Sequence, residues 1–190
     1  MNAGKTTSLL QSDYNYRQRG MNTLLFTSKS DDRSGVGVIR SRIGIEREAI
    51  AVDENFDLFM YVSNQIQNSP VHCVFVDEAQ FLTSAQVLQL TLICDRLEIP
   101  VLCYGLRTDF RGEPFEGSKY LLAWAEELVE VKTICTSGRK ATMSARLNES
   151  GQQVKEGAQI DVGFHYAPLS RHIFNLTEVS PIDYTIPTKS

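Results

Sequence analysis

Short apolar runs alternate along this chain with segments whose apolar residues recur at helical spacing. The apolar runs predict buried strands at residues 22–28, 49–52, 71–77 and 99–106. Helical spacing predicts helices at residues 5–19, 55–66, 83–97 and near 119–128. Strands that are apolar on both faces and alternate with helices are typical of an α/β fold, in which helices cover both faces of a parallel sheet.

Two further segments break this alternation. Residues 29–44, "KSDDRSGVGVIRSRIG", are rich in Gly and Arg and predict a mobile polar loop. From about Thr133 the pattern changes to short β-like pieces, "ATMSARLN" and "QIDVGFHYAPLSRHIF". We therefore expect one main domain at residues 1–132, a small loop-rich lobe at 133–180 and a frayed tail at 181–190.

Thr83 or Ser84 is expected to cap the helix at 83–97. In parallel sheets ligands bind beyond the carboxyl ends of the strands. Those ends carry the pair Asp77 and Glu78 and the segment "GLRTDFRGEPF". The candidate chemistry is therefore expected there.

Composition narrows the class of partner. The 190 residues are 42% hydrophobic and carry a formal net charge of -4. An acidic balance argues against a surface that neutralises many nucleic-acid phosphates, so a small-molecule partner is expected. No apolar run approaches the roughly 20 residues that span a bilayer, and no signal-like stretch opens the chain, so we expect a cytoplasmic protein with no membrane partner.

The four cysteines, Cys73, Cys94, Cys103 and Cys135, form no C-x-x-C pair. The first three lie in apolar segments, which favours buried free thiols over disulfides. Cys135 lies in a turn-like segment, "ICTSGRK".

The first residues contain part of a phosphate-binding loop. Gly4 would let the backbone approach a phosphate, Lys5 would bind its oxygens, and Thr6 would hold Mg²⁺ at the start of a helix. A lysine followed by two threonines also suits an ordinary helix start. The motif alone leaves both interpretations open.

A carboxylate that ends a buried strand is the second half of such a site. Asp77 could reach a Mg²⁺ ion held by Thr6, although an aspartate that caps a turn would look the same. Glu78 either points to the opposite face of the strand or lies in the following loop. In either position it could act as the general base of a kinase, or be a solvated loop acid.

The segment "LRTDFRGEPF" supplies Leu106, Phe110 and Phe115, beside Arg107 and Arg111. Aromatic side chains near a phosphate site suit a flat base that stacks on them. Core packing explains the same residues equally well.

Taken in order, "MNAGKTT", "DDR", "SRIG", "VFVDEAQF", "GLRTDFRGEPF" and "KTIC" resemble the cellular, bacterial-type thymidine kinases over residues 1 to about 166. The resemblance implies a P-loop NTPase-like parallel sheet flanked by helices, with a small C-terminal lobe that is a degenerate zinc ribbon. It also implies transfer of the γ-phosphate of ATP to the 5′-hydroxyl of thymidine in nucleotide salvage, usually in a homotetramer.

The resemblance assigns roles residue by residue. The ATP loop would comprise Met1, Asn2, Ala3, Gly4, Lys5 and Thr6. A second ATP and Mg²⁺ segment would comprise Asp77, Glu78, Ala79 and Gln80. Glu78 would accept the proton, and Thr6 and Asp77 would hold the Mg²⁺. The thymine pocket would be lined by Leu106, Phe110 and Phe115, and by Tyr166 from a substrate-closing loop.

Two departures from the family accompany the resemblance. Family members carry a strand and the first phosphate-loop residues before the position of Met1, so we expect that the written start omits N-terminal residues. In the small lobe Cys135 and His172 occupy two of four zinc positions, and Ser137 and Ser170 occupy the other two. Serine hydroxyls are poor zinc ligands, so zinc is not expected to bind.

Three functions follow as hypotheses. The leading one is an active thymidine kinase with ATP and Mg²⁺. Its rival is a remnant that folds or oligomerises without turnover, since the phosphate loop and the metal site both depart from the family. A DNA-acting ATPase is the third, against which the acidic balance and the aromatic residues count. His72 and His165 are interpreted as ordinary structural or surface residues.

Overall fold

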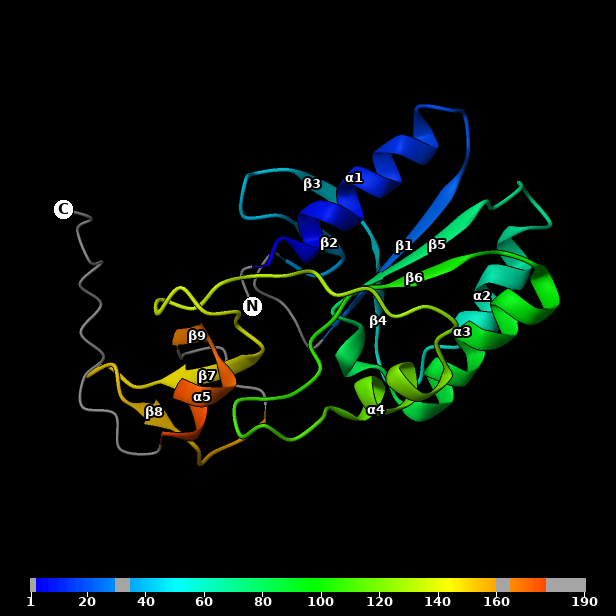
Figure 1. Cartoon of the computed structure of the whole chain (residues 1–190). Helices are drawn as coiled ribbons and strands as arrows, with labels where there is room; N and C mark the ends of the chain where they lie inside the picture. Colours follow the sequence, from blue (N-terminus) through cyan, green and yellow to red (C-terminus); the bar gives the residue numbers. More distant parts are fainter. Residues whose placement is uncertain (1–2, 30–34, 160–164, 177–190) are drawn as a thin grey trace. The chain divides into compact units, whose positions relative to one another are not determined.

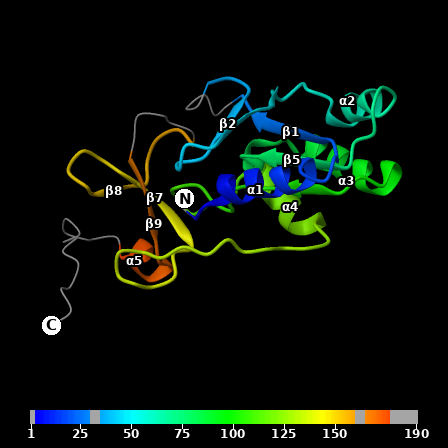
Figure 2. The same cartoon turned by 90° about the horizontal axis from the view of Figure 1, so that it is seen from above.

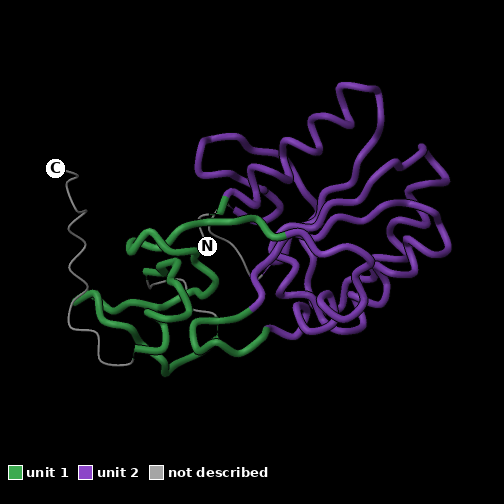
Figure 3. Tube along the Cα trace, in the orientation of Figure 1, with its two compact units in different colours: residues 1–3, 108–114, 130–190 green, residues 4–107, 115–129 purple. Residues whose placement is uncertain are grey.

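The structure is a computed structural model that describes residues 3–29, 35–159 and 165–176 (Figure 1). The chain divides into two compact units (Figure 3). The larger unit comprises residues 4–107 and 115–129, and the smaller unit comprises residues 1–3, 108–114 and 130–190. Each unit has its own hydrophobic core.

The larger unit is built on a four-stranded parallel sheet with the strand order β4-β1-β5-β6. Its strands are β1 (Thr23–Ser28), β4 (Ile50–Val52), β5 (Cys73–Asp77) and β6 (Val101–Cys103). All four lie where apolar runs predicted them. The α/β class with a parallel sheet is therefore confirmed, and β1 and β5 are paired as far as Thr27 opposite Asp77.

Helices cover both faces of this sheet because successive side chains of a strand point to opposite sides. On one face Leu25 and Phe75 pack with Leu9 and Leu10 of α1 (Lys5–Arg17). Figures 1 and 2 show α1 alongside β1 and β5. The helical prediction for residues 5–19 is confirmed.

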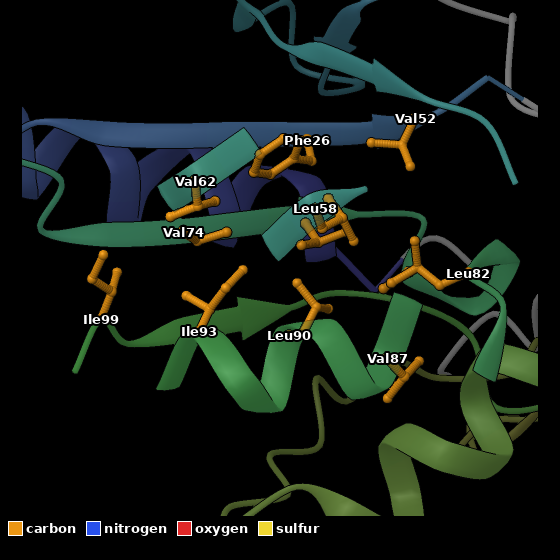
Figure 4. Close-up of a cluster of buried hydrophobic side chains, with 12 residues drawn as sticks. Phe26, Val52, Leu58, Val62, Val74, Leu82, Val87, Leu90, Ile93 and Ile99 are labelled. Atoms are coloured by element: carbon orange, nitrogen blue, oxygen red, sulfur yellow. The ribbon is translucent and has the colours of Figure 1, made fainter. Parts of the chain in front are cut away.

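The other face holds the largest buried cluster, which packs against α2 (Leu58–Gln65) and α3 (Ser84–Leu97) (Figure 4). Phe26 is central to it and is completely buried. Full burial of one such side chain contributes roughly 1.5–3 kcal/mol. Within the described residues, no helix combines the length and apolar character needed to cross a membrane.

Local signals decide where the helices begin. Thr83 caps α3, since its hydroxyl accepts a hydrogen bond from the Gln86 amide while the Gln86 side chain accepts one from the Thr83 amide. Of the two residues expected as the cap, Thr83 is the one used. The short 3₁₀ helix η1 (Ala79–Phe81) follows β5, and α4 (Glu116–Trp124) packs on it.

The prediction of a mobile polar loop at residues 29–44 was wrong for part of that segment. Val38–Arg40 forms β2, which pairs antiparallel with β3 (Glu46–Glu48). Ile39 anchors this hairpin because it is buried in the same cluster as Leu9 and Leu10. Arg40 and Glu46 add an exposed ion pair across the two strands.

The smaller unit contains a three-stranded antiparallel sheet with the order β8-β7-β9. Its elements are β7 (Met143–Leu147), β8 (Gln153–Val154), β9 (His165–Leu169) and the helix α5 (Arg171–Asn175). The sequence pattern had predicted β-like structure as far as Phe174. This prediction was wrong from Arg171 onwards, where the chain forms a helix. Ser170 starts the helix by accepting a hydrogen bond from the amide of Ile173.

All four cysteines are free thiols, which confirms the expectation for Cys73, Cys94 and Cys103. Cys73 and Cys135 are buried, while Cys94 and Cys103 are half-buried. Burial raises the pKa of Cys73 to about 11, which keeps this thiol protonated and unreactive. His72 accepts a hydrogen bond from the Asn22 amide, and His165 is exposed.

Candidate active site

The start of α1 meets the carboxyl end of β5 in the larger unit. Thr6 is in the first turn of the helix, and its Oγ1 donates a hydrogen bond to Oδ2 of Asp77 at 3.1 Å. The two residues are 71 positions apart in the sequence, and the parallel sheet brings them together. The two halves of the phosphate site that the sequence suggested are thus adjacent.

The ionised form of the Asp77 carboxylate is disfavoured in the folded protein. It is 4% exposed, and burial followed by the charge of Glu78 raises its pKa to about 6, while the Glu78 amide, the Thr6 hydroxyl and the charge of Lys5 act in the opposite direction. Within the described chain, its Oδ1 is buried without a hydrogen-bond partner of good geometry. A divalent cation would relieve both conditions, since carboxylate and hydroxyl oxygens are the ligands that Mg²⁺ prefers.

The N-terminus of α1 suits an anion. Gly4, at φ 80°, has the left-handed backbone that glycine tolerates best, and it has no side chain with which to cap the helix. The amide groups of the first turn and the positive end of the helix dipole favour a phosphate there, beside the ammonium group of Lys5. Met1 and Asn2 lie outside the described residues, and Ala3 belongs to the smaller unit.

Glu78 follows β5 directly, but strand pairing stops at Asp77. Of the two placements considered from the sequence, the loop is the one observed. Glu78 has a left-handed backbone at φ 51°, which is uncommon for a non-glycine residue, and it precedes η1. Its Oε2 accepts a hydrogen bond of 2.5 Å from Nε2 of Gln80, while Ala79 and Gln80 are buried.

Two of the expected thymine-pocket residues lie in the larger unit. Leu106 is half-buried, and its amide donates a hydrogen bond to Oε1 of Gln80. Phe115 is 6% exposed and packs edge-on against Phe81, with ring centroids 5.5 Å apart. Both are thereby attached to the η1 segment that follows Asp77.

The other two, Phe110 and Tyr166, lie in the smaller unit, where Arg146 joins them. The guanidinium carbon of Arg146 is 3.7 Å from the centroid of the Phe110 ring. Its Nε and Nη2 donate hydrogen bonds to the Tyr166 hydroxyl at 3.1 and 2.9 Å. Its Nη2 also donates to the carbonyl of Ala158 at 2.6 Å.

Sequence reasoning missed Arg146. An arginine in a short β-like piece predicts a solvent-facing side chain, because arginine is rarely buried unless it is paired. Here it is 1% exposed, and its partners come from residues 12 to 36 positions away. No local pattern in the sequence carries that signal.

The expected zinc remnant lies in the smaller unit. Cys135 is 2% exposed, and although burial raises the pKa of its thiol, hydrogen bonds from the amides of Ser137 and Ser170 outweigh burial and lower it to about 7. His172 is exposed on α5. Among the residues that the structure describes, no three His, Cys, Asp or Glu side chains converge as a metal site would require.

A parallel sheet with a Gly-Lys-Thr helix start beside a strand-end aspartate is typical of P-loop nucleotide-binding proteins. Comparison with known proteins agrees. The sequence model of the family "Thymidine kinase" matches residues 1–174. The chain therefore belongs to the thymidine kinase family, whose members are transferases.

Three relatives illustrate the similarity, and each is described as a thymidine kinase. The protein of Pasteurella multocida is 58% identical over 170 residues, which cover 90% of this chain and 88% of the relative. The protein of Xanthomonas campestris pv. campestris is 52% identical over 195 aligned positions, which cover 98% of this chain and 93% of the relative. The protein of Rhodopirellula baltica is 58% identical over 163 residues, which cover 86% of this chain and 77% of the relative.

Proposed function

We propose that this protein phosphorylates thymidine to thymidine monophosphate, with ATP as the phosphoryl donor, in nucleotide salvage in the cytoplasm. Family membership supports the reaction. The single structural observation that carries it is the hydrogen bond between Thr6 and Asp77, which joins the helix start to the strand end. That arrangement matches what a nucleotide triphosphate and its metal ion require.

The triphosphate would bind at the N-terminus of α1. Lys5 would contact phosphate oxygens, and the amides after Gly4 would donate hydrogen bonds to them. Thr6 and Asp77 would hold Mg²⁺, because Thr6 supplies a hydroxyl and Asp77 a buried carboxylate, one oxygen of which has no hydrogen-bond partner among the described residues. When bound, the ion would neutralise charge that develops on the phosphate oxygens.

Glu78 would act as the general base. It lies one residue beyond Asp77, the proposed metal ligand, and its carboxylate accepts a hydrogen bond from the side-chain amide of Gln80. The 5′-hydroxyl of thymidine would lose its proton to this carboxylate as it attacks the γ-phosphate. Ala79 and Gln80 complete the segment that the resemblance assigns to ATP.

The resemblance assigns the thymine base to Leu106 and Phe115 of the larger unit and to Phe110 and Tyr166 of the smaller unit. The aromatic rings offer flat apolar surfaces on which a base stacks. Phe110 and Tyr166 would be presented together because Arg146 binds both. We expect no nucleic-acid partner, and by family resemblance we expect a homotetramer.

The donor set at Cys135 does not fit a structural zinc ion. A closed structural zinc site is built mainly from thiolate and imidazole ligands, and the resemblance assigns two of its four positions to Ser137 and Ser170. We therefore propose that packing of the small core around Cys135, Ala145 and Phe174 holds this lobe together instead. No step of the reaction depends on zinc.

The test is to incubate the purified protein with ATP, Mg²⁺ and thymidine and to separate the nucleotides by chromatography. We expect thymidine monophosphate and ADP in equal amounts, and no product when Mg²⁺ is removed by a chelator. Deoxycytidine serves as the control nucleoside. Calorimetric binding of thymidine without any product would instead support the non-catalytic remnant and contradict the proposal.

A further inference from the structure

Gln80 is a polar side chain in an almost fully buried position. It is 1% exposed and belongs to η1, the turn that follows Asp77 and Glu78. A buried amide is costly unless its polar atoms are paired. Both ends of this one are paired, and with two different functional segments.

The nitrogen end of the amide faces Glu78. Nε2 of Gln80 donates a hydrogen bond to Oε2 of Glu78 at 2.5 Å. A bond from a neutral donor to a carboxylate is stronger than one between two neutral groups. It restricts a long acidic side chain whose own backbone, at φ 51°, is uncommon for a non-glycine residue.

The oxygen end bonds to the backbone of Leu106, one of the residues expected to contact the nucleoside. Oε1 of Gln80 accepts a hydrogen bond of 3.0 Å from the amide of Leu106. The carbonyl of Leu106 in turn accepts one of 2.5 Å from the hydroxyl of Ser118 in α4. A chain of hydrogen bonds therefore runs from the Glu78 carboxylate through Gln80 to the backbone of Leu106 and on to α4, all within the larger unit.

Gly105 leaves the space that Gln80 fills. A Cβ atom added at Gly105 would be 2.8 Å from Oε1 of Gln80 and 3.1 Å from its backbone nitrogen. Contacts under 3.0 Å require a shift, and the side-chain amide is the atom group free to move. The absence of a side chain at Gly105 therefore permits the observed position of the amide.

We infer that Gln80 is a positioning residue for phosphoryl transfer, which holds the carboxylate of Glu78 at a fixed place relative to the Leu106 wall of the nucleoside pocket. The inference rests on the proposed function and deepens it. The family resemblance places Gln80 in an ATP-binding segment, whereas the geometry engages both ends of its amide with Glu78 and Leu106. Gln80 contributes by orienting the general base Glu78 and the acceptor nucleoside, and not by binding the donor nucleotide.

The physical reason is that proton abstraction depends steeply on geometry. A misplacement of about 1 Å in a reacting group can reduce the rate about 100-fold. Without the amide, the Glu78 carboxylate would lose the hydrogen bond that orients its Oε2, and its alignment with the attacking hydroxyl would be less well defined. The loss would appear in kcat, since neither the triphosphate contacts nor the stacking surfaces change.

The experiment compares Gln80→Met with the wild type in steady-state kinetics and in calorimetric binding of MgATP. Methionine keeps the approximate volume and removes both hydrogen bonds. We expect kcat to fall by about 10- to 100-fold, while the KM for ATP and the Kd of MgATP change by less than about threefold. Gln80→Glu, which keeps the shape but places a second carboxylate against Glu78, should show the same loss.

Gln86 provides a matched control. It is 3% exposed, and its side chain likewise bonds only within the larger unit, to Thr83, Asp53 and Phe56. Gln86→Met should lower the melting temperature and leave kcat unchanged. Gly105→Ala is the complementary variant, because it displaces the Gln80 amide without altering it, and we expect it to lower kcat in the same way.

The outcomes separate this inference from the proposed function. An active wild type whose kcat is unchanged in Gln80→Met overturns the inference alone. A variant with normal kcat and weakened MgATP binding overturns it in favour of a nucleotide-binding role. A wild type that forms no thymidine monophosphate overturns the proposed function and this inference with it. Should Gln80→Met fail to fold, Gln80→Glu and Gly105→Ala decide by the same criteria.

Discussion

Replacing Asp77 by asparagine should make the metal-free protein more stable and catalytically inactive. The carboxylate is 4% exposed, and burial followed by the charge of Glu78 raises its pKa from 3.8 to about 6. This difference in pKa between the unfolded and the folded protein corresponds to a destabilisation of about 3 kcal/mol at pH 8. Asparagine has nearly the same shape and no charge, and one oxygen of Asp77 already lacks a partner within the described chain. We therefore expect Asp77→Asn to raise the free energy of unfolding at pH 8 by about 2 to 3 kcal/mol.

The gain should depend on pH in a defined direction. Because the pKa of Asp77 is higher in the folded than in the unfolded protein, the ionised carboxylate destabilises the fold fully above pH 6. The penalty diminishes as the pH falls below 6, and it disappears only below pH 3.8, where the group is protonated in both states. The advantage of Asp77→Asn should therefore decline from pH 8 to about 1 kcal/mol near pH 4.5.

Urea unfolding in a metal-free buffer measures this directly. The single tryptophan, Trp124, lies in α4 of the larger unit, so its fluorescence reports on the unit that contains Asp77. Saturating Mg²⁺ with ATP should stabilise the wild type and not the variant. Phosphorylation of thymidine by the variant should fall by more than about 100-fold.

Asp109 is the matched control, with the opposite sign. It is also buried, yet hydrogen bonds from Arg111, at 2.9 and 3.1 Å, outweigh its burial and lower its pKa. Its ionised form therefore stabilises the fold above the unfolded pKa, and this stabilisation is lost as the pH falls. Asp109→Asn should lose stability at pH 8, measured by far-ultraviolet circular dichroism. Equal losses for both variants would refute the electrostatic reasoning about Asp77.

Three further substitutions test other parts of the structure. Arg146→Met removes two hydrogen bonds to Tyr166 and should raise the KM for thymidine by about tenfold with little change in the KM for ATP; equal changes in both would contradict the role of Arg146. Gly117→Ala should destabilise the protein by about 1–3 kcal/mol in thermal unfolding, because its Cβ would lie 2.6 Å from the carbonyl oxygen of Ala79. The usual stabilisation by alanine in a helix would refute that contact. Phe26→Ala should cost about 3–5 kcal/mol in urea unfolding, and a loss below about 1 kcal/mol would show that its cluster repacks.

The sequence predicted the main sheet and its helices well, and for a physical reason. Strands buried on both faces appear as continuous apolar runs, and α3 has a capping box at Thr83 that fixes its start. The strand order β4-β1-β5-β6 could not be predicted from local patterns, because it depends on pairing between segments that are far apart in the sequence. The segments predicted as domains remain a prediction, although the contacts group residues 108–114 with the smaller unit.

The β2–β3 hairpin and the burial of Arg146 could not be predicted from local sequence patterns. The hairpin strands are three residues long, and only Ile39 among them is buried, so their apolar signal is too short to stand out from a polar loop. Arg146 is buried because Phe110, Ala158 and Tyr166 surround it after folding. By contrast, the proximity of Thr6 and Asp77 could be predicted from the sequence. Asp77 ends a strand and Thr6 lies at the start of a helix, and in an α/β fold ligands bind where the carboxyl ends of parallel strands meet such helix starts.

The central claim is that Thr6 and Asp77 hold one metal ion on a bound triphosphate. The most direct measurement is electron paramagnetic resonance of Mn²⁺, used in place of Mg²⁺, titrated with ATP into the wild type, Thr6→Val and Asp77→Asn. We expect a protein-bound Mn²⁺ signal that needs ATP, and a loss of affinity of at least about tenfold in each variant. Equal Mn²⁺ affinity in all three proteins would contradict the claim.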